Sequence, residues 1–195
     1  MNFVPDYTVP ALDVDFDEVQ QTFEVNVFAV MRICQAFAPL LMRSKGTIVQ
    51  IGSVAGVIPY VFGSVYNASK AALHAYSNTL RVELAPFGVS VITIVTGGVK
   101  SRIARTERSL PDGSYYQAIR EDYDRRQKHS QDGAMENEDY ARSVAGQVLR
   151  GGRKWVWEGN KSWLVWFLDS FAPRGIWVCL LRLRYADRVL ADERL

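Results

Sequence analysis

The chain is poor in cysteine, in histidine and in net charge, and each shortage excludes a class of protein. Its two cysteines, Cys34 and Cys179, lie far apart, with no CxxC motif and no histidine cluster beside them. Neither a disulfide framework nor a metal site is therefore expected, and a reducing compartment fits this composition. The 23 basic and 21 acidic residues leave a formal net charge of +2, which gives no basic field for nucleic acid. Residues 1–6 also lack the basic and apolar segments of a secretory signal peptide.

Hydrophobic residues, by contrast, are plentiful. They make up 48% of the 195 residues, and charged residues make up 23%, which is the balance of one globular domain with a sizeable core. Asp13 or Asp15 can cap a helix in which apolar residues recur every three or four positions, and this pattern runs on to about residue 41. We expect Pro39 to kink or interrupt this helix and Lys45-Gly46 to end it.

Two segments that are rich in β-branched residues predict buried strands. Residues 47–51 form the first strand, and the loop that follows it carries Ser53. Residues 66–85 are largely apolar and predict a helix, and residues 89–95 form the second strand. A strand, a helix and a strand in this order are typical of an α/β fold with a parallel sheet, in which ligands bind at the carboxyl ends of the strands.

The character of the chain changes to polar over residues 100–139, which include several arginines. Such a segment beside the carboxyl edge of a sheet suits a mobile lid over a substrate. A pair of solvated surface helices is an alternative of equal weight. Beyond this segment, residues 137–149 predict a helix and residues 155–157 a short strand.

The tail is rich in aromatic residues. All five tryptophans lie within residues 155–185, in apolar segments that Asp169 and Pro173 interrupt. No uninterrupted stretch there reaches the ~20 apolar residues that span a bilayer. Tryptophan near Arg182 and Arg184 is typical of a segment that lies in a membrane interface. A hydrophobic lid or dimer contact packed on the core is an alternative of equal weight.

Tyr66 and Lys70 lie one helical turn apart, so both are expected on one face of their helix. Reduction of a ketone by hydride transfer leaves an alkoxide, which needs a nearby acid and a hydrogen bond to the carbonyl oxygen. The pKa of a free tyrosine is ~10, and a cationic neighbour lowers it. Lys70 is the predicted neighbour, and the hydroxyl of Ser53 is the predicted second donor. The spacing alone also fits an exposed helix pair, so the assignment depends on the surrounding motifs.

Several short motifs follow one another along the chain. They are Glu24-Val25-Asn26-Val27, Lys45-Gly46-Thr47-Ile48-Val49, Gly52-Ser53, Tyr66 with Ser69-Lys70, and Thr96-Gly97-Gly98-Val99. Through these motifs the chain resembles the short-chain dehydrogenase/reductase family over roughly residues 10–120. Within that family it is most similar to the fungal NADPH-dependent 1-acyldihydroxyacetone phosphate reductase branch, through residues 62–66, 69–72 and 94–99.

The resemblance implies a catalytic role for four residues. Tyr66 would be the catalytic acid, and Lys70 would lower the pKa of Tyr66. Ser53 would orient the substrate carbonyl. Asn26 would lie in the preceding helix and support a water-mediated proton relay to Lys70, although an asparagine in an apolar helix is ordinarily a satisfied polar residue.

The resemblance also implies a nicotinamide cofactor, NADP(H). Tyr66 and Lys70 would contact it, with Lys70 holding the nicotinamide ribose, and Val99 and Ser101 match the loop that contacts the nicotinamide amide. In that loop Thr96-Gly97 replaces the usual Pro-Gly, and Ser101 replaces a threonine but keeps the hydroxyl. The preference for NADP over NAD rests on the resemblance alone.

The chain departs from the family at its beginning. Family members start with a strand, a Gly-rich turn and a helix that receives the cofactor pyrophosphate, whereas the first glycine here is Gly46. We therefore expect the C-terminal part of a Rossmann-like doubly wound parallel sheet, with one strand edge left open. Residues 1–157 would be an incomplete reductase domain with its lid at about residues 100–139. Residues 158–195 would be a hydrophobic aromatic extension.

Two interpretations of this departure stand at this point. The chain is either a fragment or misplaced start of a full reductase, or a genuine short form without cofactor affinity that acts as a binding or membrane-associated subunit. The resemblance implies reduction of a ketone, or oxidation of a secondary alcohol, on a lipid-like or secondary-metabolite substrate. We expect the chain as written to be weakly active or inactive, because it lacks the family's Gly-rich cofactor-binding turn. The expected partners are a small hydrophobic carbonyl or alcohol, a membrane surface and further copies of the chain. The expected location is the cytoplasm, or the surface of the endoplasmic reticulum or of lipid droplets.

Overall fold

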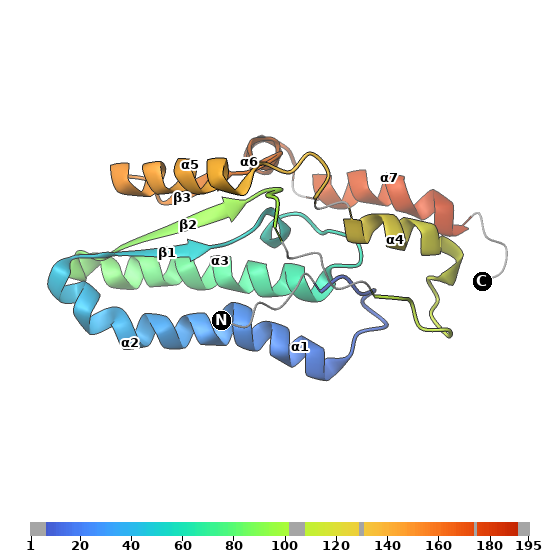
Figure 1. The fold of residues 1–195 in the computed structure, drawn as a ribbon, viewed down its shortest axis with the longest axis horizontal. Helices are drawn as coiled ribbons and strands as arrows, with labels where there is room; N and C mark the ends of the chain where they lie inside the picture. The colour runs from blue at the N-terminus through green and yellow to red at the C-terminus, as the bar shows by residue number, and fades with distance from the viewer. Residues whose placement is uncertain (1–6, 102–107, 129–130, 174, 191–195) are drawn as a thin grey trace.

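The computed structural model describes residues 7–101, 108–128, 131–173 and 175–190. Its centre is a three-stranded parallel sheet in the order β1-β2-β3. The strands are β1 (Thr47–Ile51), β2 (Ser90–Thr96) and β3 (Trp155–Glu158). Helix α3 (Ser64–Leu84) runs beneath the sheet in Figure 1, and α5 (Asn137–Arg150) lies above it. The predicted α/β fold with a parallel sheet is confirmed, and each of these elements lies within two residues of its predicted bounds.

The first long helix contains an irregular turn that the sequence did not predict. Helix α1 (Phe16–Phe23) begins where the Asp15 carboxylate accepts hydrogen bonds from the backbone N–H groups of Asp17 (2.8 Å) and Glu18 (3.2 Å), as an N-cap should. The π-helical turn Glu24–Phe28 then joins it to α2. Such turns often mark functional sites.

Helix α2 (Ala29–Ser44) contains Pro39 and continues beyond it, so the predicted interruption at Pro39 is wrong. Pro39 is exposed, and water can therefore serve the backbone carbonyl that loses its partner there. The helix ends as predicted at Lys45, which adopts the left-handed conformation with φ of 51°.

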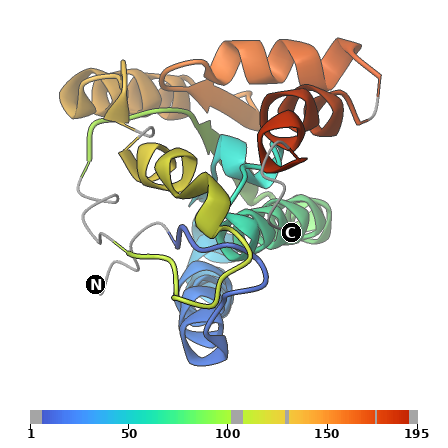
Figure 2. The same cartoon turned by 90° about the vertical axis from the view of Figure 1, so that its right-hand side faces the viewer.

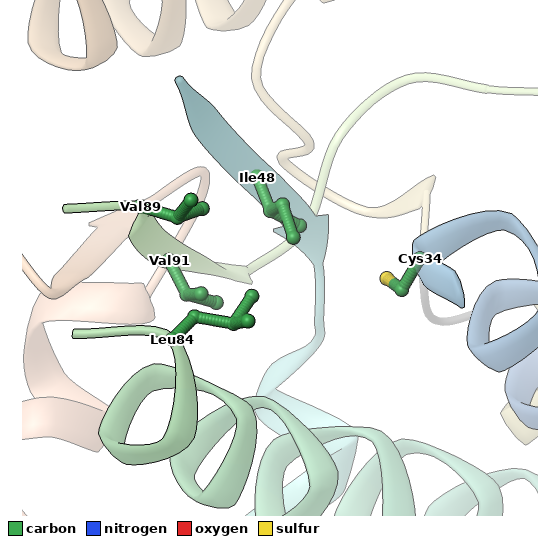
Figure 3. Packing of buried hydrophobic residues seen from close by; sticks show 5 residues of the cluster. All are labelled: Cys34, Ile48, Leu84, Val89 and Val91. Atoms are coloured by element: carbon green, nitrogen blue, oxygen red, sulfur yellow. The ribbon is translucent and has the colours of Figure 1, made fainter. Parts of the chain in front are cut away.

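The core between the sheet and these helices is apolar. Figure 3 shows Ile48 of β1 on the same side of the cluster as Val89, Val91 and Leu84, with Cys34 of α2 on the opposite side. The prediction that β1 is a buried strand is only half right, because its residues alternate between buried and exposed. β1 is an edge strand among the described residues, and α5 packs on β2 and β3 instead.

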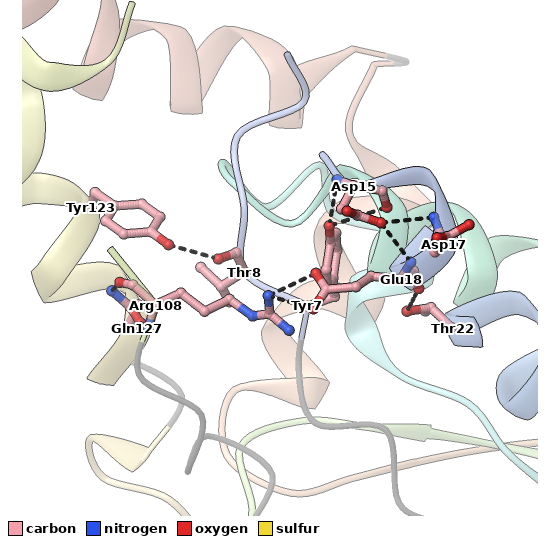
Figure 4. A network of polar contacts seen from close by, with 9 residues as sticks. All are labelled: Tyr7, Thr8, Asp15, Asp17, Glu18, Thr22, Arg108, Tyr123 and Gln127. Carbon is pink, nitrogen blue, oxygen red and sulfur yellow. Dashed lines mark hydrogen bonds and ion pairs between the residues drawn. The ribbon is translucent and has the colours of Figure 1, made fainter. Parts of the chain in front are cut away.

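Residues 108–123 contact the segment before α1 and α1 itself. Figure 4 shows the Arg108 guanidinium against the Glu18 carboxylate (2.7 Å), and the Tyr123 hydroxyl donating to the Thr8 carbonyl (3.0 Å). Tyr123 belongs to α4 (Arg120–Lys128) and packs edge-on against Phe62. Residues 102–107 and 129–130 of the predicted lid lie outside the described residues.

The tail forms two helices, α6 (Ser162–Phe171) and α7 (Ile176–Leu190). Figure 2 shows them as a pair of adjacent helices at one side of the molecule. Val165 of α6 packs with Val95 of β2, and Trp177 of α7 is packed against the same cluster. The tail is therefore anchored to the sheet by one side.

One helix in the described part of the chain, Phe16–Ser44, is long and apolar enough to cross a membrane by length and composition alone. The core helix of a soluble protein passes the same test. Here Val27 and Cys34 are buried, so part of its apolar surface packs within this fold.

We expect Ile94→Ala to lower the free energy of unfolding by about 2–5 kcal/mol, because Ile94 is fully buried between the sheet and α5 and its truncation leaves a cavity. Urea denaturation measures this change. Leu149→Ala is the matched control, since Leu149 is 86% exposed. Equal losses for the two variants would contradict the packing described here.

Candidate active site

The carboxyl ends of the strands gather the predicted catalytic residues. β1 ends at Ile51 and is followed by Gly52, Ser53 and the 3₁₀ turn Val54–Gly56. Figure 1 shows the arrowheads of β1 and β2 pointing toward the end of the molecule that carries α4 and α7. Tyr66 and Lys70 lie in the first turns of α3, which begins at Ser64. This is the sheet edge where α/β proteins bind ligands.

Lys70 connects the helix to the end of the first strand. Its Nζ donates to the carbonyl oxygen of Ile51 (3.1 Å) and lies 5.7 Å from the centroid of the Tyr66 ring. Burial of the ammonium lowers the pKa of Lys70 to about 8, because a desolvated cation is disfavoured. The structure therefore brings Tyr66 and Lys70 together as predicted.

Ser53 is held by its backbone and by its side chain. Its hydroxyl oxygen accepts a hydrogen bond from the backbone N–H of Ala55 (3.1 Å), and its own N–H donates to Nε2 of His74 (3.3 Å). The side chain is half-buried. Ser53 thus stands at the carboxyl end of β1 with its hydroxyl hydrogen available as a donor.

His74 is a residue of this site that sequence reasoning missed. It is buried, and it lies one helical turn beyond Lys70, as Lys70 lies one turn beyond Tyr66. Burial and then the charge of Lys70 lower the pKa of His74 to about 4. The signal that predicts it is the continued four-residue spacing from Tyr66 to Lys70 to His74 along one helix face.

Asn26 lies within the π-helical turn Glu24–Phe28. Its Nδ2 donates to the hydroxyl oxygen of Ser69 (3.1 Å), and the Ser69 hydroxyl donates to the carbonyl of Tyr66 (2.8 Å). The contact described is therefore with the neighbour of Lys70 rather than with Lys70 itself. The water-mediated relay from Asn26 to Lys70 stays a prediction.

Val99 and Ser101 lie in the loop after β2. Val99 forms a β-bridge with Met135, and the backbone N–H of Ser101 donates to Oε1 of Gln131 (3.1 Å). At the start of this loop the backbones of Gly97 and Gly159 pack so closely that a Cβ on Gly97 would lie 2.3 Å from the Asn160 carbonyl oxygen. The cofactor contacts of Val99 and Ser101 stay predictions.

The donor chemistry at Lys70 fits a nicotinamide ribose. An ammonium group has three N–H donors and no acceptor, and the Ile51 carbonyl takes one of the donors. The others can serve a pair of ribose hydroxyls at the same sheet edge. Within the described ranges, no group of three or more His, Cys, Asp and Glu side chains is placed to hold a metal ion.

The lowered pKa of Lys70 predicts a pH-dependent stability. Between about pH 8 and 10.5 the folded chain has lost the Lys70 proton and the unfolded chain still holds it, so the free energy of unfolding rises with pH in this window. Lys70→Met should stabilise the chain at neutral pH. The difference in the free energy of unfolding between Lys70→Met and the wild type should shrink as the pH rises through this window. The decrease should be less than about 1.4 kcal/mol per pH unit, since Lys70 is only half-buried.

Urea denaturation across this pH range measures the difference between wild type and variant. Lys154→Met is the control, because Lys154 is exposed. A gap between wild type and Lys70→Met that stays constant with pH would refute the desolvation of Lys70.

Curated relatives support the predicted resemblance. The chain is 43% identical over 174 residues to the short-chain dehydrogenase fogD of Aspergillus ruber, and this match covers 88% of this chain and 61% of that protein. It is 47% identical over 119 residues to the NADPH-dependent 1-acyldihydroxyacetone phosphate reductase of Schizosaccharomyces pombe, covering 58% of this chain and 40% of the reductase. The chain thus spans about 61% of the length of a curated relative such as fogD.

Solved structures show the same fold. A short-chain dehydrogenase from Streptomyces avermitilis superposes with a TM-score of 0.69 at 18% identity, over 98% of this chain and 69% of that one. A short-chain dehydrogenase from Burkholderia cenocepacia in complex with NADP gives a TM-score of 0.64 at 22% identity, over 94% and 65%. The family model described as short chain dehydrogenase matches residues 6–111, just over half of the sequence. The chain therefore belongs to the short-chain dehydrogenase/reductase family, as its motifs predicted.

Proposed function

We propose that this chain carries the catalytic centre of an NADP(H)-dependent oxidoreductase that reduces a ketone, or oxidises a secondary alcohol. The observation that carries the proposal is the Lys70 ammonium, 5.7 Å from the Tyr66 ring centroid and bonded to the carbonyl that ends β1. Ser53 follows that carbonyl by two residues. Membership of the short-chain dehydrogenase/reductase family supports the reaction class and the cofactor.

The proposed reaction uses the two hydroxyl groups together. The ketone oxygen accepts hydrogen bonds from the hydroxyls of Ser53 and Tyr66, which polarise the carbonyl and stabilise the negative charge that develops on oxygen. When bound, a nicotinamide cofactor would supply the hydride in reduction and accept it in the reverse direction. Tyr66 would give its proton to the substrate oxygen as negative charge develops there, which yields the alcohol.

Lys70 then stabilises the phenolate that Tyr66 becomes when it gives up its proton. Proton transfer converts the Tyr66 phenol into a phenolate, and an adjacent ammonium charge favours that anion. The pKa of Lys70, lowered by burial to about 8, is near the working pH of the cell, which suits a group that exchanges protons with solvent. Asn26, one hydrogen bond from Ser69, is proposed to support this exchange through water.

The proposed substrate is hydrophobic, either a lipid-like ketone or a secondary metabolite. The turn after Ser53 is apolar, and its Val54 and Ile58 pack in one cluster with Trp177 and Leu181 of α7. Two fungal relatives whose names specify 1-acyldihydroxyacetone phosphate are consistent with a lipid-like substrate.

We expect Tyr66→Phe to lower kcat/KM for ketone reduction by about 10²–10⁴-fold, because it removes the proton donor. NADPH affinity should change little, since the ring and Lys70 remain. The assay is NADPH oxidation by the full chain with an aliphatic ketone, beside a fluorescence titration of NADPH. Tyr115→Phe is the matched control, because Tyr115 is 71% exposed.

Two results would contradict the proposed reaction. Full activity in Tyr66→Phe would refute the assigned acid. A wild-type chain that shows no saturable NADPH binding would rule out catalysis by this form of the chain.

We also propose that the tail binds a lipid surface, which would place the chain peripherally on the endoplasmic reticulum or on lipid droplets rather than free in the cytoplasm. One side of α6 and α7 packs on the core, and the other side exposes large apolar side chains. These are Trp163, Leu164, Trp166, Phe167, Phe171, Val178, Leu180 and Leu183. Exposed basic residues, Lys161 and Arg182, lie beside them. Tryptophan with flanking cations is typical of a membrane interface.

Trp163→Ser combined with Phe167→Ser should abolish flotation of the full chain with phosphatidylcholine and phosphatidylserine vesicles, because it removes the exposed apolar contact. Leu149→Ser, on α5, is the control and should float like the wild type. If the wild type does not float and instead forms a dimer that the double variant dissociates, the surface is a contact between copies of the chain.

A further inference from the structure

The buried imidazole of His74 is enclosed by the loop that carries Ser53. The glycines on either side of this loop leave room for the ring. A Cβ on Gly52 would lie 2.3 Å from Nε2 of His74, and a Cβ on Gly56 would lie 2.7 Å from its Cε1. Trp155 of β3 closes the remaining side, with its ring edge-on to the imidazole at a centroid distance of 5.5 Å. The loop and the ring are therefore shaped to each other.

The polar contact within this enclosure goes to the catalytic serine. The Ser53 backbone N–H donates to Nε2 of His74 over 3.3 Å. The bond to His74 ties the backbone of Ser53 to α3. The Ser53 hydroxyl oxygen accepts from the N–H of Ala55, which ties the side chain within the loop. His74 is thus the residue of α3 that holds the Ser53 backbone.

We propose that His74 is a positioning residue, which fixes the Ser53 backbone and so keeps the Ser53 hydroxyl aligned with the substrate carbonyl. This inference rests on the proposed function. Tyr66, Lys70 and His74 follow one another at four-residue intervals on α3, so one rigid helix sets the positions of the acid, the ammonium and the serine loop. Residues whose only task is to hold a reacting group in place change kcat more than substrate binding.

The protonation state of His74 suits this role. Nε2 accepts a hydrogen bond only in the neutral ring whose proton is on Nδ1. Burial and the charge of Lys70 lower the pKa of His74 to about 4. The ring is therefore neutral at physiological pH, and the acceptor for Ser53 is present.

The test compares two substitutions at position 74 in the full chain. His74→Gln keeps an acceptor near the position of Nε2, whereas His74→Leu keeps bulk and removes the acceptor. We expect His74→Leu to lower kcat for ketone reduction by about 10–100-fold with little change in KM for NADPH, and His74→Gln to recover most of that loss. Leu73→Ala is the control, because Leu73 is also buried on the same helix and takes part in neither of the hydrogen bonds described for Ser53.

A double variant separates positioning from general destabilisation. If His74 acts through the Ser53 hydroxyl, His74→Leu should have almost no further effect on kcat in a Ser53→Ala background. Additive losses in the double variant, or an equal loss in Leu73→Ala, would overturn the inference.

Amide hydrogen exchange of Ser53, followed by NMR, gives a readout that needs no activity. The exchange rate should rise at least about tenfold in His74→Leu, because the N–H loses its acceptor, and should stay near the wild-type rate in His74→Gln. Unchanged exchange in His74→Leu would overturn the tether. A wild-type chain that lacks reductase activity would instead refute the proposed function, while the exchange rates would still decide whether His74 holds the Ser53 loop.

Discussion

The hydrogen bond from the Lys70 ammonium to the Ile51 carbonyl is the contact on which the arrangement of the site depends. It joins the helix that carries Tyr66 to the strand end that precedes Ser53. The parallel pairing of β1 with β2 opposes Ile51 to Ile94, so the end of β1 is itself held by the sheet. An ammonium in this position is partly desolvated, and the cost of that desolvation appears as the lowered pKa of Lys70. The desolvated Lys70 ammonium lowers the free energy of unfolding at the position where the proposed reaction needs a positive charge. Perturbed pKa values of this kind are common in active sites.

Much of this arrangement could be predicted from the sequence, because local patterns encode it. Four of residues 47–51 are β-branched, and the structure ends β1 where this run ends. The pairing of Tyr66 with Lys70 follows from helix periodicity alone. The role of Ser53 needed both the strand end and the family motifs, and the structure adds His74 as the group that connects Ser53 to α3. The four-residue spacing from Lys70 places His74 on the same helix face, but it does not indicate which loop His74 contacts.

The failed predictions share a physical cause. Pro39 was expected to kink or interrupt the helix, but α2 runs on through it, because its exposed position lets water replace the lost backbone partner. β1 was expected to be wholly buried, but burial depends on which helix covers which strand, and α5 packs on β2 and β3. The residues of the π-helical turn that holds Asn26 do not distinguish it from an ordinary α-helical segment. In each case tertiary context, and not local propensity, decides the outcome.

The close approach of Gly97 and Gly159 has a consequence for how such a site can change during evolution. Where two backbones touch with no room for a Cβ, the surface consists of peptide groups, and no substitution can reshape it without moving a strand end. Substitutions can then alter only the side chains around it, such as those of α7 that pack with the turn after Ser53. The contact between Gly97 and Gly159 thus forms a part of this sheet edge that substitutions cannot easily change. The side chains around it form a part that they can.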